Sequence, residues 1–194
     1  MPSEINQTTI INRALQMLGS PPVANIQAND RGARAMNTAY KPVLFSILQE
    51  NYWYFAIKRA KLPADTEKPL HTWTNKFRLP GDFIMLAPED QRSQFPEPSE
   101  WIVEGDFILS DDDGPLDVRY VTNSITESSF PSLFAEAFSA QLSVMTCEQI
   151  TQSTAKQRNV IAIYDRQISL AKKRNFILIE KPRSPKSVWL SARD

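Results

Sequence analysis

The sequence predicts an α+β protein in which helices from both ends of the chain pack as an antiparallel helical bundle with a small antiparallel β insertion. Three observations support this fold class. Apolar residues recur every three to four positions in residues 6–51 and again after Ser129, which is the helical period. Between these segments, short runs of β-forming residues are separated by turns that contain glycine and aspartate. A basic, proline-containing segment follows the helices and predicts an extended C-terminal tail.

The predicted organisation is a discontinuous helical domain that carries an insertion. Residues 1–56 and 123–180 are expected to form the helical domain, residues 57–122 the β insertion domain, and residues 181–194 the tail. The length of 194 residues suits this arrangement, and a hydrophobic content of 42% is enough for a core. The structural core is predicted to contain the following side chains: Leu15, Leu18, Trp53, Phe55, Phe134, Phe138 and Leu142.

Two helices are predicted in the N-terminal segment. The first covers about residues 6–18 and is followed by Gly19, a residue type favoured where helices end. Asp30 is expected to cap the second helix, which covers about residues 31–51. Pro42 lies inside the second helix and is expected to kink or restart it, because proline lacks the backbone N–H of a helical hydrogen bond.

The insertion contains the signals of antiparallel strands. Residues 83–86 form a short apolar run after a turn at residues 80–82. Residues 101–109 predict a hairpin with Glu104-Gly105-Asp106 at its turn. Residues 116–121 alternate between apolar and polar side chains, which is typical of a half-buried strand.

Two further helices are predicted after Ser129. Pro131 suits a first helical turn, and Ser153 or Thr154 is expected to cap the last helix. Each helix is expected to turn one apolar face inward. These faces consist of Phe134, Phe138, Leu142, Met145 and Ile150 in the first helix, and of Val160, Ile161, Tyr164, Ile168 and Ala171 in the second.

Residue types that perform chemistry are few, so no catalytic residue, cofactor or metal site is predicted. His71 is the only histidine, which excludes sites with several histidine ligands, and a surface or packing role is expected for it. Cys147 is the only cysteine and is expected to be a small buried side chain in a helix. The run Asp111-Asp112-Asp113-Gly114 lacks the alternating ligand positions of an EF-hand and predicts a solvated turn.

The tail combines a basic segment with an apolar one. Lys181 to Lys186 is basic and contains two prolines, a composition that is usual for segments without a fixed structure of their own. Val188-Trp189-Leu190 follows as an apolar anchor, and tryptophan is a frequent binding hot spot. Three possibilities stay open for the tail. It binds a partner, folds back on its own domain, or is disordered.

A series of short segments follows in order along about residues 5–175: Ile10-Ile11-Asn12-Arg13-Ala14-Leu15, Leu18-Gly19 with Pro21-Pro22-Val23, Tyr40–Leu48, Trp53-Tyr54-Phe55-Ala56 with Arg59-Ala60-Lys61-Leu62, Phe77-Arg78-Leu79-Pro80-Gly81-Asp82-Phe83, Trp101–Leu109 and Leu116–Val121. In this order they resemble the tail tubular protein A family, the head-to-tail adaptors of short-tailed bacteriophages. The specificity lies in the series and not in a single motif.

The resemblance implies a structural function. Proteins of that family form a twelve-subunit ring between the portal protein and the tail nozzle protein, and genome DNA passes through the ring without sequence recognition. The implied location is the head–tail junction of the virion, and the host cytoplasm during assembly. A C-terminal extension that docks on the portal corresponds here to the tail, with these residues as the portal-binding set: Lys181, Pro182, Arg183, Pro185, Lys186, Val188, Trp189 and Leu190.

Two other classes of function are considered beside the adaptor. A tail-associated, envelope-degrading hydrolase would need a cleft with convergent carboxylates, which sequence alone cannot place among 22 acidic residues. A DNA-binding accessory protein would carry an excess of positive charge. Because Lys plus Arg equals Asp plus Glu, at 22 each, the net charge does not indicate nucleic-acid binding.

Overall fold

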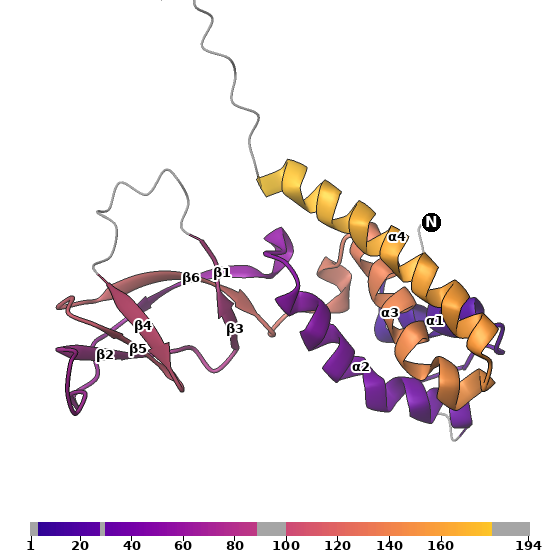
Figure 1. Cartoon of the computed structure of the whole chain (residues 1–194), viewed down its shortest axis with the longest axis horizontal. Coiled ribbons are helices and arrows are strands. Elements are labelled where there is room, and N and C mark those ends of the chain that lie inside the picture. Colours follow the sequence, from indigo (N-terminus) through magenta and orange to yellow (C-terminus); the bar gives the residue numbers. More distant parts are fainter. Residues whose placement is uncertain (1–3, 28–29, 89–99, 180–194) are drawn as a thin grey trace, which may run out of the picture.

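The computed structural model describes residues 4–27, 30–88 and 100–179. Within these ranges the chain is a mixed α and β protein, with four α-helices and two small three-stranded antiparallel sheets. The helices gather at one end of the molecule and the sheets at the other (Figure 1). The helical end is built by segments from both parts of the sequence, and the sheets by the segment between them.

The elements have the following bounds. The helices are α1 (Gln7–Leu18), α2 (Arg31–Gln49), α3 (Ser132–Thr151) and α4 (Thr154–Ile179). The strands are β1 (Ile57–Leu62), β2 (Asn75–Arg78), β3 (Phe83–Leu86), β4 (Trp101–Glu104), β5 (Phe107–Ser110) and β6 (Leu116–Thr122). Two 3₁₀ turns are η1 (Tyr54–Ala56) and η2 (Glu127–Ser129).

Gly19 and Asp30 cap helices as predicted, and Asn6 is a further cap that was not predicted. Asn6 caps α1 by accepting a hydrogen bond from the backbone N–H of Thr9 at 2.9 Å, and Gly19 ends this helix in the left-handed conformation, with φ of 76°. The Asp30 side chain accepts from the backbone N–H of Ala33 at 2.8 Å and caps α2 as predicted. Pro42 was predicted to kink or restart the helix; it does not restart it, because α2 continues through Pro42 to Gln49.

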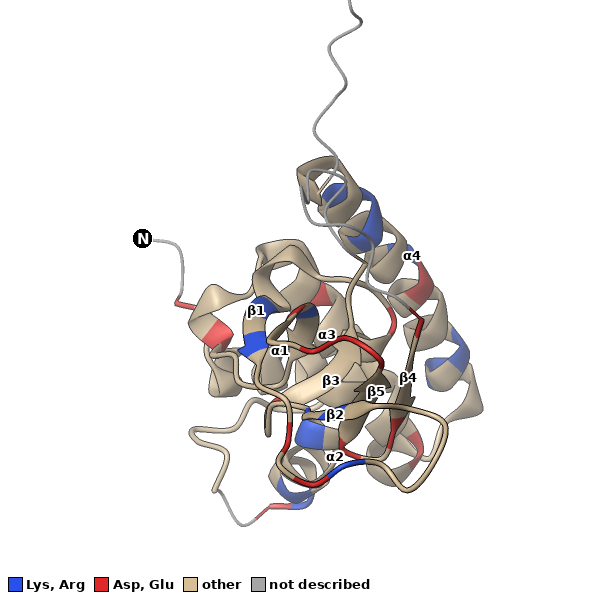
Figure 2. Ribbon diagram, turned by 90° about the vertical axis from the view of Figure 1, so that its left-hand side faces the viewer, with Lys and Arg blue, Asp and Glu red and all other residues tan. Residues whose placement is uncertain are grey.

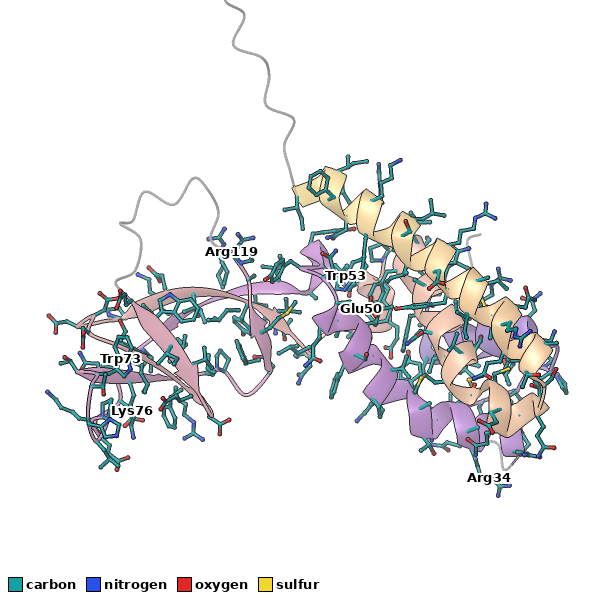
Figure 3. All side chains as sticks on the ribbon, in the orientation of Figure 1. Arg34, Glu50, Trp53, Trp73, Lys76 and Arg119 are labelled. Carbon is teal, nitrogen blue, oxygen red and sulfur yellow. The ribbon has the colours of Figure 1, made fainter. Side chains whose placement is uncertain are left out.

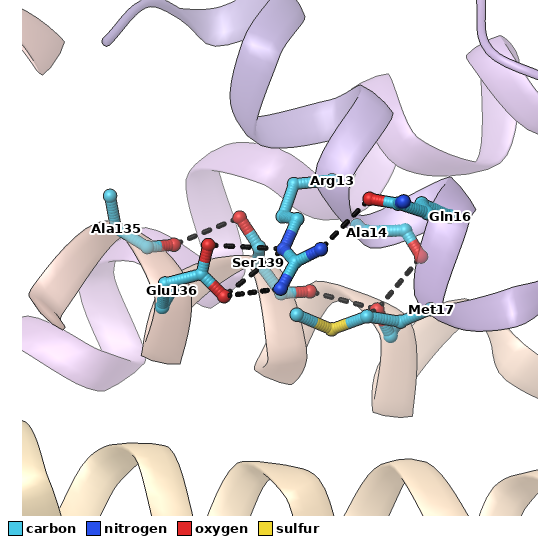
Figure 4. Close-up of polar contacts among 8 residues, drawn as sticks. Arg13, Ala14, Gln16, Met17, Ala135, Glu136 and Ser139 are labelled. Atoms are coloured by element: carbon cyan, nitrogen blue, oxygen red, sulfur yellow. Dashed lines mark hydrogen bonds and ion pairs between the residues drawn. The ribbon is translucent and has the colours of Figure 1, made fainter. Parts of the chain in front are cut away.

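Helix α3 lies at the centre of the helical end and contacts α1, α2 and α4. Its contact with α1 contains an ion pair, in which the Arg13 guanidinium lies 3.0 Å from the Glu136 carboxylate (Figure 4). Beside it, the buried Ser143 hydroxyl lies 3.0 Å from the carbonyl oxygen of Ala14. A helix with neighbours on three sides must be apolar or small-sided almost all round, as α3 is.

Two inward faces were predicted partly wrongly. Met145 is 61% exposed, because the buried face of α3 continues from Leu142 to Thr146, one helical turn further on. Ile161 is 40% exposed, because the buried positions of α4 begin at its neighbour Val160, about 100° away around the helix axis. In both helices the spacing was compatible with more than one face.

The predicted core residues lie in the main hydrophobic core, which fills the helical end. Leu15, Leu18, Trp53, Phe134, Phe138 and Leu142 are buried, and Phe55 is half-buried and packs against the same core. Aromatic rings form much of its centre. The Trp53 and Phe134 ring centroids lie 5.0 Å apart at a steep angle, which is a favourable edge-to-face arrangement.

The two sheets differ in strand order and share a smaller second core. Their orders are β1-β6-β3 and β2-β5-β4, with every pairing antiparallel. Leu62 and Leu116 of the first sheet and Phe77 and Ile108 of the second belong to this core. Val121 of β6 belongs instead to the main core, so the first sheet connects the second sheet to the helices.

Asp82 holds the strands of the first sheet in place. Its carboxylate accepts hydrogen bonds from the Tyr120 hydroxyl at 3.0 Å and the buried Thr122 hydroxyl at 2.7 Å, and pairs with the Lys58 ammonium at 2.7 Å. These bonds favour the ionised carboxylate. The bond from Lys58, followed by those from Thr122 and Tyr120, lowers the pKa of Asp82 from 3.8 to about 2.

Replacing Asp82 by asparagine is expected to lower the free energy of unfolding near neutral pH by about 1–3 kcal/mol, because the buried Thr122 hydroxyl and Lys58 lose an ionised acceptor. The pKa is lower in the folded state, so the carboxylate stabilises the protein above pH 4 or so and this contribution is lost as pH falls toward about 2. Urea unfolding of both proteins at several pH values measures this contribution to the free energy of unfolding.

The matched control for this experiment is Asp117→Asn. Asp117 lies 3.6 Å from the Lys61 ammonium at the exposed surface of the same sheet, where an ion pair stabilises little. The control should change the free energy of unfolding by less than about 0.5 kcal/mol. Equal acid sensitivity in the Asp82 variant and the unmodified protein would contradict the role given to Asp82.

Candidate interaction surface

A groove lies where the start of α3, the segment after α2 and the last turns of α4 meet. It has a volume of about 350 Å³. Its floor contains the buried Trp53 and Phe134, and its rim contains Tyr54, Leu133 and Leu178, which are each between 36% and 48% exposed. The groove is thus a mainly apolar and aromatic hollow that opens to solvent, the usual character of a binding site.

Asn175 positions one wall of the groove. This residue of α4 is buried, and its side-chain amide donates to the carbonyl oxygen of Tyr52 and accepts from the backbone N–H of Tyr54, each at 2.9 Å. An asparagine that satisfies both a donor and an acceptor of an irregular segment fixes that segment against the helix. The rim residue Tyr54 therefore has a defined place relative to α4.

Glu50 makes a second polar connection between α2 and α4 (Figure 3). Its carboxylate accepts a hydrogen bond from the Tyr164 hydroxyl at 2.6 Å and pairs with the Lys172 ammonium at 2.9 Å. Burial, followed by the hydrogen bond to Glu50, raises the pKa of Tyr164 above its ordinary value. Together with Asn175, these contacts hold the C-terminal half of α4 in position beside the groove.

The last turn of α4 exposes apolar side chains on all sides. Phe176, Ile177, Leu178 and Ile179 are 44–59% exposed, although they are consecutive and cannot share one face of a helix. A helix end in water normally keeps a polar face. This apolar end of α4, defined as residues 176–179, is therefore suited to contact with another segment or another protein.

A second exposed apolar surface lies on β4, at the opposite end of the molecule from α1 (Figure 1). β4 is an edge strand in the order β2-β5-β4, and Trp101, Ile102 and Val103 are 38–44% exposed. An edge strand with apolar side chains on both faces offers both backbone hydrogen-bonding groups and apolar area to a partner. The molecule thus has two separate apolar surfaces.

Charge is distributed unevenly between the two ends. Helix α4 contains six basic residues and one acidic residue, and Figure 2 shows the basic positions as bands along it. Residues 57–122 contain 13 acidic and 8 basic side chains. The net charge of zero therefore combines a basic helix with an acidic β region.

The residues considered for catalysis or metal binding are dispersed. His71 is exposed in the loop before β2 with its Nδ1 3.1 Å from the Thr72 hydroxyl, whereas Cys147 is buried in α3. The Asp111 carboxylate accepts from the backbone N–H and hydroxyl of Thr74, each at 2.9 Å, and so organises a turn. In the part of the chain that the structure describes, no three histidine, cysteine or acidic side chains are grouped as metal ligands.

The predicted portal-binding residues, from Lys181 to Leu190, lie outside the described residues. The groove and the apolar end of α4, from which that segment continues, were not predicted. The signal for the apolar end is visible in the sequence as Phe176-Ile177-Leu178-Ile179, four consecutive apolar residues at the end of a helical pattern. The groove has no comparable signal, because its residues come from three distant segments.

Comparison with known proteins found no matching family model and no similar curated protein. Among the described helices, none has the length and apolar composition needed to span a membrane.

Proposed function

We propose that this protein is the head-to-tail adaptor of a short-tailed bacteriophage and has a structural function. In the proposal, twelve copies form a ring that joins the portal protein to the tail nozzle protein and encloses a channel for genome DNA. The helices act as an antiparallel bundle that packs side by side around the ring, and the β region points toward the nozzle. The protein then resides at the head–tail junction of the virion, after assembly in the host cytoplasm.

The observation that carries the proposal furthest is the apolar end of α4. It is exposed where residues 181–194 continue from the helix, which is the segment expected to reach the portal. An apolar helix end of this kind suits a subunit that becomes buried in a larger assembly. The ordered resemblance of the segments between Ile10 and Val121 adds the identity of that assembly.

The second apolar surface supports the same conclusion. A ring subunit contacts two neighbours and two further components, so it needs several contact surfaces rather than one reaction site. The edge strand β4 belongs to the sheet part of the molecule, whereas α4 belongs to the helical part (Figure 1). Two separated surfaces fit a protein that connects a component on one side to a component on the other.

The uneven charge supports head-to-tail packing. In a ring, each subunit presents one surface to the neighbour on one side and a different surface to the other neighbour. A basic α4 and an acidic β region on the same chain are complementary surfaces for such a contact. The balanced net charge also suits a DNA channel, because each neutralised phosphate would add affinity and retard the passage of DNA.

The mass of the purified protein, alone and mixed with the portal protein of the same phage, tests the proposal. Light scattering of the protein alone should detect either a small species or a ring. After portal is added, it should detect a much larger complex. A small species that ignores portal would contradict the adaptor function. In that case the hydrolase would be tested on envelope polymers, and the DNA-binding function by retention on duplex DNA at increasing salt.

A further inference from the structure

The groove and the apolar end of α4 form one continuous surface, because Leu178 belongs to both. Trp53, Phe134 and Asn175 line this surface and are held rigidly by the main core or by hydrogen bonds. The surface is therefore preformed, which reduces the entropic penalty for a segment that binds there.

We propose that Val188-Trp189-Leu190 of the same chain occupies this groove before the protein assembles with its partners. The segment is apolar and contains an aromatic ring, which matches a groove with an aromatic floor and an apolar rim. Val188-Trp189-Leu190 is also the one apolar cluster in the sequence after Ile179, and it includes the largest apolar side chain available. Tryptophan provides a large contact area with few rotatable bonds.

Arg174 gives the groove a specific preference for an aromatic ring. It lies on the lining of the groove, and its side chain makes no hydrogen bond or ion pair with residues 4–27, 30–88 and 100–179. A guanidinium that has no polar partner is free to stack on an indole, which is a favourable cation–π contact. An aliphatic segment would lack this contact.

The chain is long enough to make the return. Trp189 follows Ile179 by ten residues, and an extended chain of that length spans about 33 Å. Since Leu178 itself lines the groove, the segment needs only to double back over the end of α4. Pro182 and Pro185 stiffen this connection, and the short loop gives the segment a high effective concentration at the groove.

Occupation of the groove would regulate assembly, and this consequence rests on the proposed function. The tail cannot bind the portal while its anchor lies in the groove, so the apparent affinity for portal falls with the fraction of free tail. Docking also covers the apolar end of α4 in the unassembled subunit. The protein would thus be protected from premature association until the portal provides a better site.

Fluorine NMR of the full chain, with its tryptophans replaced biosynthetically by 5-fluorotryptophan, tests the docking without any portal. The chain gives four signals, for Trp53, Trp73, Trp101 and Trp189, and Trp189→Phe assigns the last. We expect the Trp189 signal to be broad and shifted from that of a free peptide of residues 184–194. Leu133→Glu at the rim should move it to the free-peptide position.

The matched control is Met145→Glu, which places the same charge at an exposed apolar position of the same helix, away from the groove. It should leave the Trp189 signal unchanged, and an unchanged circular dichroism spectrum in both variants shows that the fold is intact. A Trp189 signal at the free-peptide position in the unmodified protein would overturn the proposal. A Trp189 signal that moves to the free-peptide position on tenfold dilution would overturn it as well, because the groove would then hold the tail of a second copy.

Neither overturning result touches the adaptor function, which is tested separately by portal binding.

Discussion

Replacing Trp53 by alanine is expected to lower the free energy of unfolding by about 3–5 kcal/mol. The Trp53 side chain is 1% exposed, and its ring meets those of Phe55 and Phe134. Its indole N–H donates to the carbonyl oxygen of Ile47 at 2.8 Å, near the C-terminal end of α2 (Figure 3). The substitution therefore leaves a cavity in the main core and removes the shorter of two hydrogen bonds to the Ile47 carbonyl oxygen, which also accepts from the backbone N–H of Glu50 at 3.4 Å.

The position of Trp53 prevents the neighbouring residues from relaxing into the cavity, so the loss of stability stays large. It joins the end of α2 to the start of α3 and forms the floor of the groove. Neighbouring segments cannot collapse into the cavity without moving both helices. For comparison, removing the ring of Trp101, which is 42% exposed on β4, should lower stability by less than about 1 kcal/mol.

Urea unfolding followed by circular dichroism at the helical wavelength measures both variants. The expected order is a large shift of the midpoint for Trp53→Ala and a small one for Trp101→Ala, with similar slopes. If the two shifts were equal, the packing of Trp53 between the helices would not be the main support of this core.

The sequence predicted the helices well because their signals are local. Asn6, Gly19 and Asp30 terminate helices through contacts with residues three or four positions away, so the capping chemistry can be recognised without tertiary structure. The hairpin at residues 101–109 was predictable for the same reason. Its turn residue Gly105 adopts φ of 56°, which glycine accepts readily.

The parts that were missed depend on contacts between distant segments. β1 was not recognised as a strand, because its partner β6 lies more than fifty residues away and its own side chains do not alternate cleanly. The division into two sheets follows from a core that includes both Leu62 and Ile108. Asn175 looked like any polar residue of a helix, and its role depends on Tyr52 and Tyr54 at a separation of more than 120 residues.

The groove illustrates the same limitation for the functional surface. Tyr54, Leu133 and Leu178 are apolar or aromatic residues in three segments, and each of them alone would be assigned to a core. Only their joint exposure reveals a surface. By contrast, the composition of the tail alone suggests a binding segment as one of three possibilities, because a tryptophan is a frequent binding hot spot, and this stays a prediction since residues 181–194 lie outside the described residues.

Deleting residues 181–194 is expected to abolish the complex with the portal while the fold is retained. Among the described residues, the buried members of both hydrophobic cores come no later than Ala171, so we expect their packing to be retained without the deleted segment. The complex, however, depends in our proposal on the apolar anchor Val188-Trp189-Leu190 and on the basic residues before it. Light scattering of the truncated protein with portal should therefore give the sum of separate components instead of one large species.

A shorter deletion provides the control. Removing only residues 191–194 keeps the anchor and the basic segment, and it should leave the portal complex intact. Replacing Trp189 alone by alanine should weaken the complex by roughly 2 kcal/mol or more, the effect typical of a tryptophan hot spot. A complex of full mass without residues 181–194 would contradict this prediction. The helices would then contact the portal themselves, and the apolar end of α4 would be the first surface to test.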